Sequence, residues 1–153
     1  MAQAEPIAIL FPLLVGVVAT IATIGVHTLA VNSIIYFVRR ERRLGRVGPH
    51  FLPNILLVST TILIALTAHL LSIGIWAWVL ELCGEFTEGG IAFYHSAVNY
   101  TSLGYGDIVM SSRWKLLGPI EAADGLLMFG LSTAMVFAVM QRLILIRFKD
   151  LAD

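Results

Sequence analysis

Residues 101–107, Thr-Ser-Leu-Gly-Tyr-Gly-Asp, combine residue types and a spacing that could bind a cation stripped of water. A potassium ion in a narrow passage loses its hydration shell, so the protein must replace that shell with rings of oxygen. Backbone carbonyls supply such rings when consecutive carbonyls point the same way, which requires some residues at positive φ. Gly104 and Gly106 adopt positive φ without steric strain. The run therefore has the chemistry of an ion-binding loop.

Three side chains of this run add to that chemistry. The Ser102 hydroxyl offers one more oxygen at the inner end of the loop. Tyr105 is expected to turn its ring outward into surrounding helices, where its hydroxyl tethers the loop. Asp107 is expected at the external mouth, where carboxylates raise the local concentration of cations.

The segment before the loop predicts a short helix. Residues 91–100 could form a helix about 15 Å long at 1.5 Å per residue, half the thickness of the hydrocarbon core, and we place it at about residues 90–100. A helix of this length enters the membrane and must return. Irregular backbone at that depth is tolerated only where it is buried in protein or lines a watery path. Residues 89–112 are therefore predicted to be re-entrant, with the loop lining a pore.

Three long apolar runs surround this segment. The chain has 153 residues, 58% hydrophobic and 13% charged, against about 25% charged in soluble proteins. Asp, Glu, Lys and Arg are absent from 6–38 and from 51–80, and both runs exceed the ~20 residues that span a bilayer. A third run, 116–140, carries only Glu121 and Asp124. The composition is that of an integral membrane protein.

We therefore expect an all-α integral membrane protein with three transmembrane helices, one short re-entrant helix and a loop. Residues 1–50 are predicted to hold an N-terminal transmembrane helix and a basic cytoplasmic link, and residues 51–153 a pore module. Within the module, the transmembrane helices are placed at about 52–82 and 116–146, while the first helix covers about 7–38. No soluble regulatory domain is expected.

Basic residues predict the orientation, because short cytoplasmic loops are rich in Lys and Arg. The link between the first two runs carries five arginines and is expected in the cytoplasm, with Gly48-Pro49 breaking the chain before the second run. Sensor arginines recur every third position inside a span, so these contiguous ones favour anchoring or lipid contact. The N-terminus is expected outside and the C-terminus in the cytoplasm. The inner basic residues are Arg39, Arg40, Arg42, Arg43, Arg46, Arg142, Arg147 and Lys149; the outer ones are Arg113 and Lys115.

Residues 101–107 resemble the selectivity filter of potassium channels, whose common form is Thr-Val-Gly-Tyr-Gly. Gly-Tyr-Gly-Asp after a half-span helix makes the match specific. Residues 129–134, Phe-Gly-Leu-Ser-Thr-Ala, also resemble the inner-helix segment of that family, so the resemblance covers about residues 51–142. We call residues 101–107 the filter segment.

The resemblance implies a potassium-selective channel in which four identical chains surround one pore in the lipid bilayer. Potassium ions are then the transported species, and no organic cofactor is expected. The helix at 52–82 becomes the outer helix, and the helix at 116–146 becomes the inner helix that lines the cavity. The resemblance assigns potassium ligands to Ser102, Leu103, Gly104 and Tyr105. It assigns the inner-helix hinge and cavity to Gly125, Phe129, Gly130 and Thr133.

Several residues depart from the usual pattern of that family. Ser102 replaces the commoner Thr, and Leu103 replaces Val. Tyr94 and His95 stand where many members place two tryptophans behind the filter, so this pair is expected to support it. The alternatives are a weakly selective cation channel and a non-conducting subunit that associates with other channels. An enzyme is not expected, because the sequence has no catalytic constellation, and no nucleic-acid partner is expected.

Four ionisable residues within the predicted spans leave their roles open. His27 and His69 are functional hypotheses by their depth in the membrane, and the alternative is neutral imidazoles hydrogen-bonded between helices. Glu121 and Asp124 at the outer end of the inner helix either bond to the surroundings of the filter or face water.

Three further residues lie near the outer end of the second span. Trp76 and Trp78 are predicted to join an aromatic belt at the membrane interface. Cys83 is the only cysteine, so it is either a free thiol or a partner in a disulfide between chains.

Overall fold

The computed structural model describes residues 8–47 and 51–149, which form three long helices and one short one. The long helices have 34, 32 and 33 residues, and each is long and apolar enough to cross a membrane. The short helix has 12 residues, about 18 Å of rise. The predicted all-helical class with three membrane spans is confirmed, and the protein is a multi-pass membrane protein. The elements are α1 (Leu10–Arg43), α2 (Phe51–Leu82), α3 (Gly89–Tyr100) and α4 (Leu117–Lys149).

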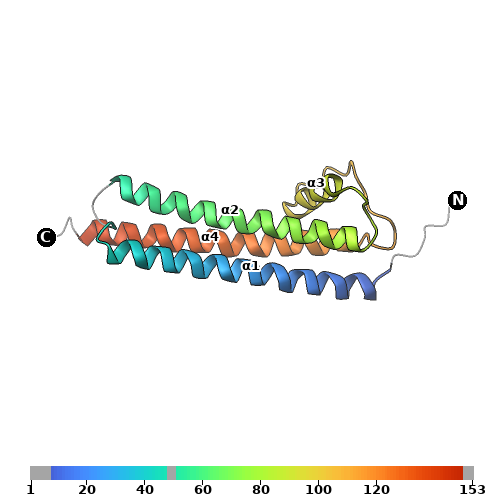
Figure 1. Ribbon diagram of the computed structural model, residues 1–153, viewed down its shortest axis with the longest axis horizontal. Helices are drawn as coiled ribbons and strands as arrows, with labels where there is room; N and C mark the ends of the chain where they lie inside the picture. Colours follow the sequence, from blue (N-terminus) through green and yellow to red (C-terminus); the bar gives the residue numbers. More distant parts are fainter. Residues whose placement is uncertain (1–7, 48–50, 150–153) are drawn as a thin grey trace.

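The three long helices lie side by side and run in alternating directions, with α3 at one end of the bundle (Figure 1). Each long helix contacts the other two, and α3 contacts α2 and α4. The beginnings of α1 and α4, the end of α2 and the whole of α3 therefore share one end of the bundle. We call this the filter end, because the filter segment follows α3 there.

Each long helix has a proline as its third residue. These prolines are Pro12 in α1, Pro53 in α2 and Pro119 in α4. The first turn of a helix leaves its N–H groups without intrahelical partners, so proline removes no helical hydrogen bond there. The prolines thus mark where the helices begin without weakening them.

The ends of α1, α2 and α3 share one hydrogen-bond arrangement. Gly45 after α1 has φ +67° and Gly84 after α2 has φ +72°. In both cases the glycine N–H donates to the carbonyl three residues back, and the next N–H donates to the carbonyl five residues back. This is the Schellman motif, which usually requires glycine at the left-handed position. After α3 the same bonds form with Ser102 at that position, at φ +58°.

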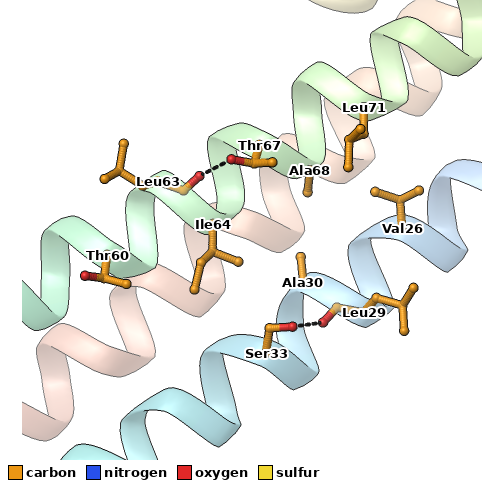
Figure 2. A pocket seen from close by; sticks show the side chains of 10 residues that line it. All are labelled: Val26, Leu29, Ala30, Ser33, Thr60, Leu63, Ile64, Thr67, Ala68 and Leu71. Carbon is orange, nitrogen blue, oxygen red and sulfur yellow. Dashed lines mark hydrogen bonds between the residues drawn. The ribbon is translucent and has the colours of Figure 1, made fainter.

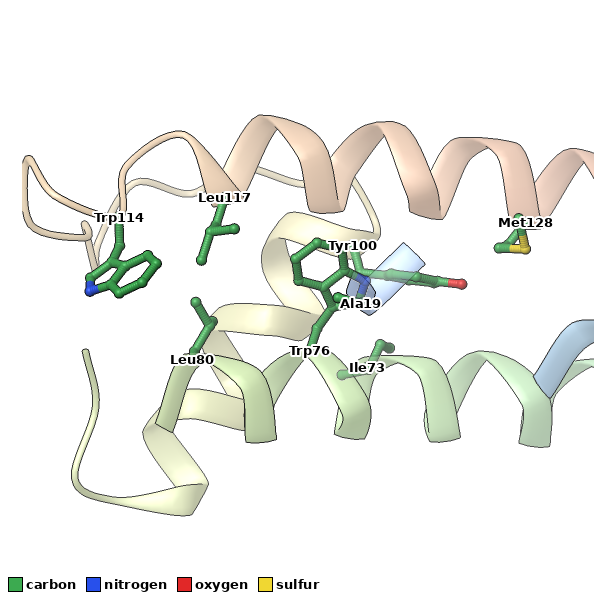
Figure 3. Close-up of a cluster of buried hydrophobic side chains, with 8 residues drawn as sticks. All are labelled: Ala19, Ile73, Trp76, Leu80, Tyr100, Trp114, Leu117 and Met128. Carbon is green, nitrogen blue, oxygen red and sulfur yellow. The ribbon is translucent and has the colours of Figure 1, made fainter. Parts of the chain in front are cut away.

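The main buried cluster lies at the filter end and joins all four helices (Figure 3). Trp76 and Tyr100 are its largest fully buried members, and in Figure 3 their rings lie close together between α2 and α4. Because lipid weakens the hydrophobic drive between membrane helices, close packing of this kind fixes their positions. The cluster therefore positions α3 and the filter segment. Its residues are Ala19, Ile73, Trp76, Leu80, Tyr100, Trp114, Leu117 and Met128.

The observed helix bounds differ most from the expected ones in α1. The other three helices begin and end within three residues of the predicted positions, whereas α1 continues five residues beyond Val38 to Arg43. Four of the five arginines expected in the link thus lie in the last turns of α1, where cations interact favourably with the helix dipole. The predicted break at Gly48-Pro49 and the N-terminal residues 1–7 lie outside the described residues.

The two tryptophans near the end of α2 have different environments. Trp78 is 61% exposed, as a residue of an interfacial belt should be. Trp76 is 0% exposed, and its Nε1 donates to Asp124 Oδ2 at 2.8 Å, so the belt prediction is wrong for this residue. Cys83 follows α2 and is half-buried, and burial raises the pKa of its thiol; the choice between a free thiol and a disulfide between chains stays a prediction.

Candidate functional site

The filter segment has an alternating backbone. Ser102, Gly104 and Gly106 have φ values of +58°, +60° and +71°, while the intervening Leu103 and Tyr105 are not at positive φ. Alternation between left-handed residues and ordinary ones turns successive carbonyls toward the same side of the chain. The sequence predicted positive φ at the two glycines but did not predict it at Ser102.

The end of α3 explains the backbone of Ser102. A left-handed conformation is unfavourable by about 1–2 kcal/mol for an L-residue other than glycine. Two hydrogen bonds that close α3 offset this, from Ser102 N to the Asn99 carbonyl at 2.8 Å and from Leu103 N to the Val98 carbonyl at 3.0 Å. The same residue therefore ends α3 and begins the alternation of the filter segment.

The two hydroxyl residues that begin the filter segment have different surroundings. Thr101 Oγ1 donates to the Ala97 carbonyl at 2.7 Å, so this hydroxyl is used within α3. Ser102 is exposed, and with Gly104 and Gly106 it lines a hollow of about 410 Å³ formed by the loop, α3 and α4. Of the two, Ser102 is the better placed to offer its oxygen to an ion.

Every residue of the filter segment is exposed in the single chain. Tyr105 is 67% exposed, so the expectation that its ring packs among surrounding helices is wrong for the helices of its own chain. Leu103 is 55% exposed in the same way. The loop thus presents both its backbone and its largest side chains outward.

Tyr94 and His95, expected behind the filter segment, contact different groups. The Tyr94 hydroxyl donates to Asp107 Oδ2 at 2.8 Å, and this hydrogen bond raises the pKa of Tyr94. The middle of α3 is thereby joined to the outer end of the filter segment. His95 Nε2 lies 2.9 Å from Asn99 Nδ2 on the same helix, and the His95 ring also hydrogen-bonds with the backbone of Ile108, directly after the filter segment.

The two carboxyl groups of α4 are buried at 0% and 2% exposure, so the alternative that they face water is wrong. Glu121 Oε2 lies 3.5 Å from Asn99 Nδ2 of α3. Asp124 accepts a hydrogen bond from Trp76 of α2 and lies within 3.0 Å of the Thr23 hydroxyl of α1. Among the described residues, both groups bond behind the filter segment and neither bonds to it.

The histidines of the spans meet at the end of α3. His27 Nε2 lies 3.4 Å and His69 Nδ1 3.3 Å from the Tyr100 hydroxyl, and all three side chains are at most 5% exposed. These imidazoles therefore lie between helices with polar partners, as the second alternative proposed. The sequence did not predict a role for Tyr100, because an aromatic residue at the end of a predicted helix does not by itself indicate one.

The expected hinge and cavity residues of α4 differ in their surroundings. A Cβ at Gly125 would lie 1.9 Å from the Tyr100 carbonyl oxygen, whereas one at Gly130 would meet nothing within 4 Å. Phe129 stacks on His69 at 4.1 Å between ring centroids, and both Phe129 and Thr133 line a hollow between α2 and α4. The hinge and cavity roles stay predictions, and Gly125 has a packing role besides.

The groove between α1 and α2 is a poor ion site (Figure 2). It is lined mostly by apolar side chains, and the hydroxyls of Ser33 and Thr67 donate to carbonyls of their own helices at 2.8 Å. Among residues 8–47 and 51–149, no group of three or more His, Cys, Asp or Glu side chains could hold a metal ion. The filter segment is therefore the strongest candidate for ion binding.

Comparison with known proteins identifies a protein family. The model of a family described as "Ion channel" matches residues 55–142, which is more than half of the chain. The matched range contains α3, the filter segment and most of α2 and α4, whereas α1 lies outside it. No curated protein and no solved structure matches the chain.

Proposed function

The chain belongs to the ion channel family, and from this premise we propose that it is the pore-forming subunit of a potassium-selective channel. As an ion channel it is not an enzyme. The observation that carries the proposal is the alternation of positive φ at Ser102, Gly104 and Gly106. A backbone of this kind can present a column of carbonyl oxygens, which is the chemistry that replaces the water of a potassium ion.

The potassium ligands in this proposal are backbone carbonyls together with one side chain. The carbonyls of Leu103, Gly104 and Tyr105 form stacked oxygen rings, and the Ser102 hydroxyl completes the innermost site. α3 directs its carbonyl end toward this inner part of the loop, which favours a cation there. Asp107 supplies negative charge at the outer end. Its hydrogen bond from Tyr94 supports this placement by holding the carboxylate near α3.

We propose a homotetramer, in which each chain contributes one filter segment to the ring. In a single chain, the loop would expose its polar backbone at membrane depth, where unsatisfied N–H and C=O groups are costly. Further copies around a closed symmetry axis would cover the outer side of the loop and enclose a watery path on its inner side. Tyr105, which is exposed within its own chain, would then pack against a neighbouring copy.

The first test is the activity of the purified protein. We expect four chains by native mass measurement, and in liposomes a flux of potassium well above that of sodium. Comparable sodium and potassium fluxes would contradict the proposal and indicate a weakly selective cation channel. A tetramer without flux would instead indicate a non-conducting subunit, and a stable monomer or dimer would contradict the ring itself.

We further propose that the filter end of the bundle faces outward and that the arginines at the end of α1 face the cytoplasm, where short basic segments are retained. A single cysteine placed at Arg43, in a Cys83→Ser background, should resist an impermeant thiol reagent added to intact cells. A cysteine at Glu88, just before α3, should react with the same reagent. The reverse pattern would contradict this orientation.

A further inference from the structure

Helix α1 has polar residues on the face that it packs against the rest of the protein. Thr23 and His27 lie four residues apart, so they share one face of the helix, and they are 0% and 2% exposed. A helix that only anchors a protein in lipid needs no buried polar groups. These two side chains therefore indicate specific partners on the neighbouring helices.

Thr23 contacts the carboxyl group of Asp124, which lies where α1, α2 and α4 meet near the filter end. Its hydroxyl lies 2.8 and 3.0 Å from the two oxygens of Asp124, which is itself only 2% exposed. The same carboxyl group accepts the Nε1–H of Trp76 at 2.8 Å. One carboxyl group thus joins α1, α2 and α4. Such a group inside a membrane needs hydrogen-bonding partners, and α1 provides one of them.

His27 reaches the end of α3. Its Nε2 lies 3.4 Å from the Tyr100 hydroxyl, which is long for a hydrogen bond. His69 Nδ1 lies 3.3 Å from the same hydroxyl. Figure 3 shows the Tyr100 ring between α2 and α4, with its hydroxyl pointing away from Trp114. The side chain that ends α3 is thereby contacted by His27 of α1 and by His69 of α2.

The position of Tyr100 determines where the filter segment begins. Tyr100 is the last residue of α3, and the hydrogen bonds that place Ser102 and Leu103 run to the two residues before it. A shift of this end by a fraction of an ångström moves the inner ligands by a similar distance. The rings of oxygen must match the size of a dehydrated ion, so a small shift changes which ion fits best.

The packing of α1 against α4 is close enough to transmit such a constraint. A Cβ at Gly16 would lie 2.9 Å from Ile120 Cγ2, so the two helices meet tightly, with Thr23 seven residues further along α1. The sliding of α1 along α4 is therefore opposed both by this contact and by the bond of Thr23 to Asp124.

We propose that α1 is a positioning helix for the filter segment, in which Thr23 on Asp124 and His27 on Tyr100 hold the end of α3 in place. The matched family range begins after α1, so it assigns no role to this helix. The inference rests on the proposed function, since it concerns the geometry of a potassium filter. Thr23 and His27 are positioning residues and contact no ion.

The test compares three threonine variants on α1. Thr23→Val keeps the shape of the side chain and removes the hydroxyl, and it should lower the ratio of potassium to sodium flux by up to about tenfold, the factor that corresponds to one ordinary hydrogen bond. Thr23→Ser restores the hydroxyl and should recover the ratio. Thr28→Val is the control, because the exposed Thr28 hydroxyl bonds only to the Ile24 carbonyl of its own helix. It should leave the ratio unchanged.

A second readout separates this inference from the proposed function. Amide hydrogen exchange at Ser102 and Leu103 should be about threefold or more faster in Thr23→Val than in wild type or Thr28→Val, whether or not the protein conducts selectively. If wild type fails the flux test and the exchange effect remains, the positioning role stands while the potassium proposal falls. Lower thermal stability with unchanged exchange at these amides would show that α1 gives only general support, and the inference would be overturned. The same exchange measurement on His27→Gln and His27→Phe should show protection with Gln, which retains a polar partner for Tyr100, and faster exchange with Phe.

Discussion

Replacing Gly104 by alanine should abolish potassium-selective conduction and leave the assembled protein folded. Gly104 has φ +60°, and a Cβ placed there would meet no atom of the chain within 4 Å. The obstacle is therefore the backbone conformation, which becomes unfavourable by about 1–2 kcal/mol per chain for an L-residue other than glycine. The alternation of the loop should relax, and the ratio of potassium to sodium flux should fall by about tenfold or more.

The matched control is Gly74→Ala. Gly74 lies within α2, has no positive φ, and a Cβ added there would also meet nothing within 4 Å. Alanine favours a helix over glycine, so this variant should conduct and select as wild type does. Normal selectivity in Gly104→Ala would contradict the proposed carbonyl column, because the column depends on the left-handed backbone at this position.

A comparison of Ser102 with Gly104 shows why the backbone at position 104 is more sensitive to an added side chain than the backbone at position 102. Ser102 already carries a Cβ at φ +58°, and its N–H bond to the Asn99 carbonyl at 2.8 Å fixes this conformation as part of the end of α3. Gly104 has a weaker connection, from its N–H to the Val98 carbonyl at 3.3 Å. A residue with a side chain is tolerated at position 102, where the end of α3 holds the backbone. Glycine is needed two residues later, at position 104.

The sequence predicted the helices well because a membrane leaves few alternatives. Uncharged runs longer than the hydrocarbon core must be helices, since every backbone group has to be satisfied internally. The half-length of the segment at 91–100 then required a re-entrant path. The end of α1 was harder to predict, because arginines that snorkel to the interface can continue a helix beyond its apolar part.

The polar contacts behind the filter segment were beyond sequence reasoning. Thr23 and Asp124 are 101 residues apart, and their pairing follows from how α1 packs on α4. The sequence indicated that carboxyl and imidazole groups at membrane depth needed explaining, but it offered no means of pairing them. Trp76 was misassigned for the same reason, since its indole meets Asp124 only in the folded bundle.

Gly125→Ala should be the most destabilising single methyl addition among the described helical glycines. The new Cβ would lie 1.9 Å from the Tyr100 carbonyl oxygen and 2.8 Å from the carbonyl carbon. Both are backbone atoms, so no side-chain rotation relieves the overlap, and either α4 or the end of α3 must move. Overpacking of a well-filled core usually lowers stability by about 1–3 kcal/mol, and we expect the upper part of that range or more. Thermal unfolding of the purified assembly measures this loss directly.

Gly130→Ala on the same helix is the control, since its Cβ would meet nothing within 4 Å and should leave the melting temperature at or above that of wild type. The pair also separates packing from the hinge role predicted for Gly125. If Gly125 is a hinge that only allows α4 to bend, Gly125→Ala should change the open probability of the channel without lowering its thermal stability. A packing glycine lowers stability and, because the displaced group is the last carbonyl of α3, also lowers potassium selectivity. Equal stability and equal selectivity of the two variants would show that α4 does not press on Tyr100, and the account of how the bundle positions the filter segment would have to be abandoned.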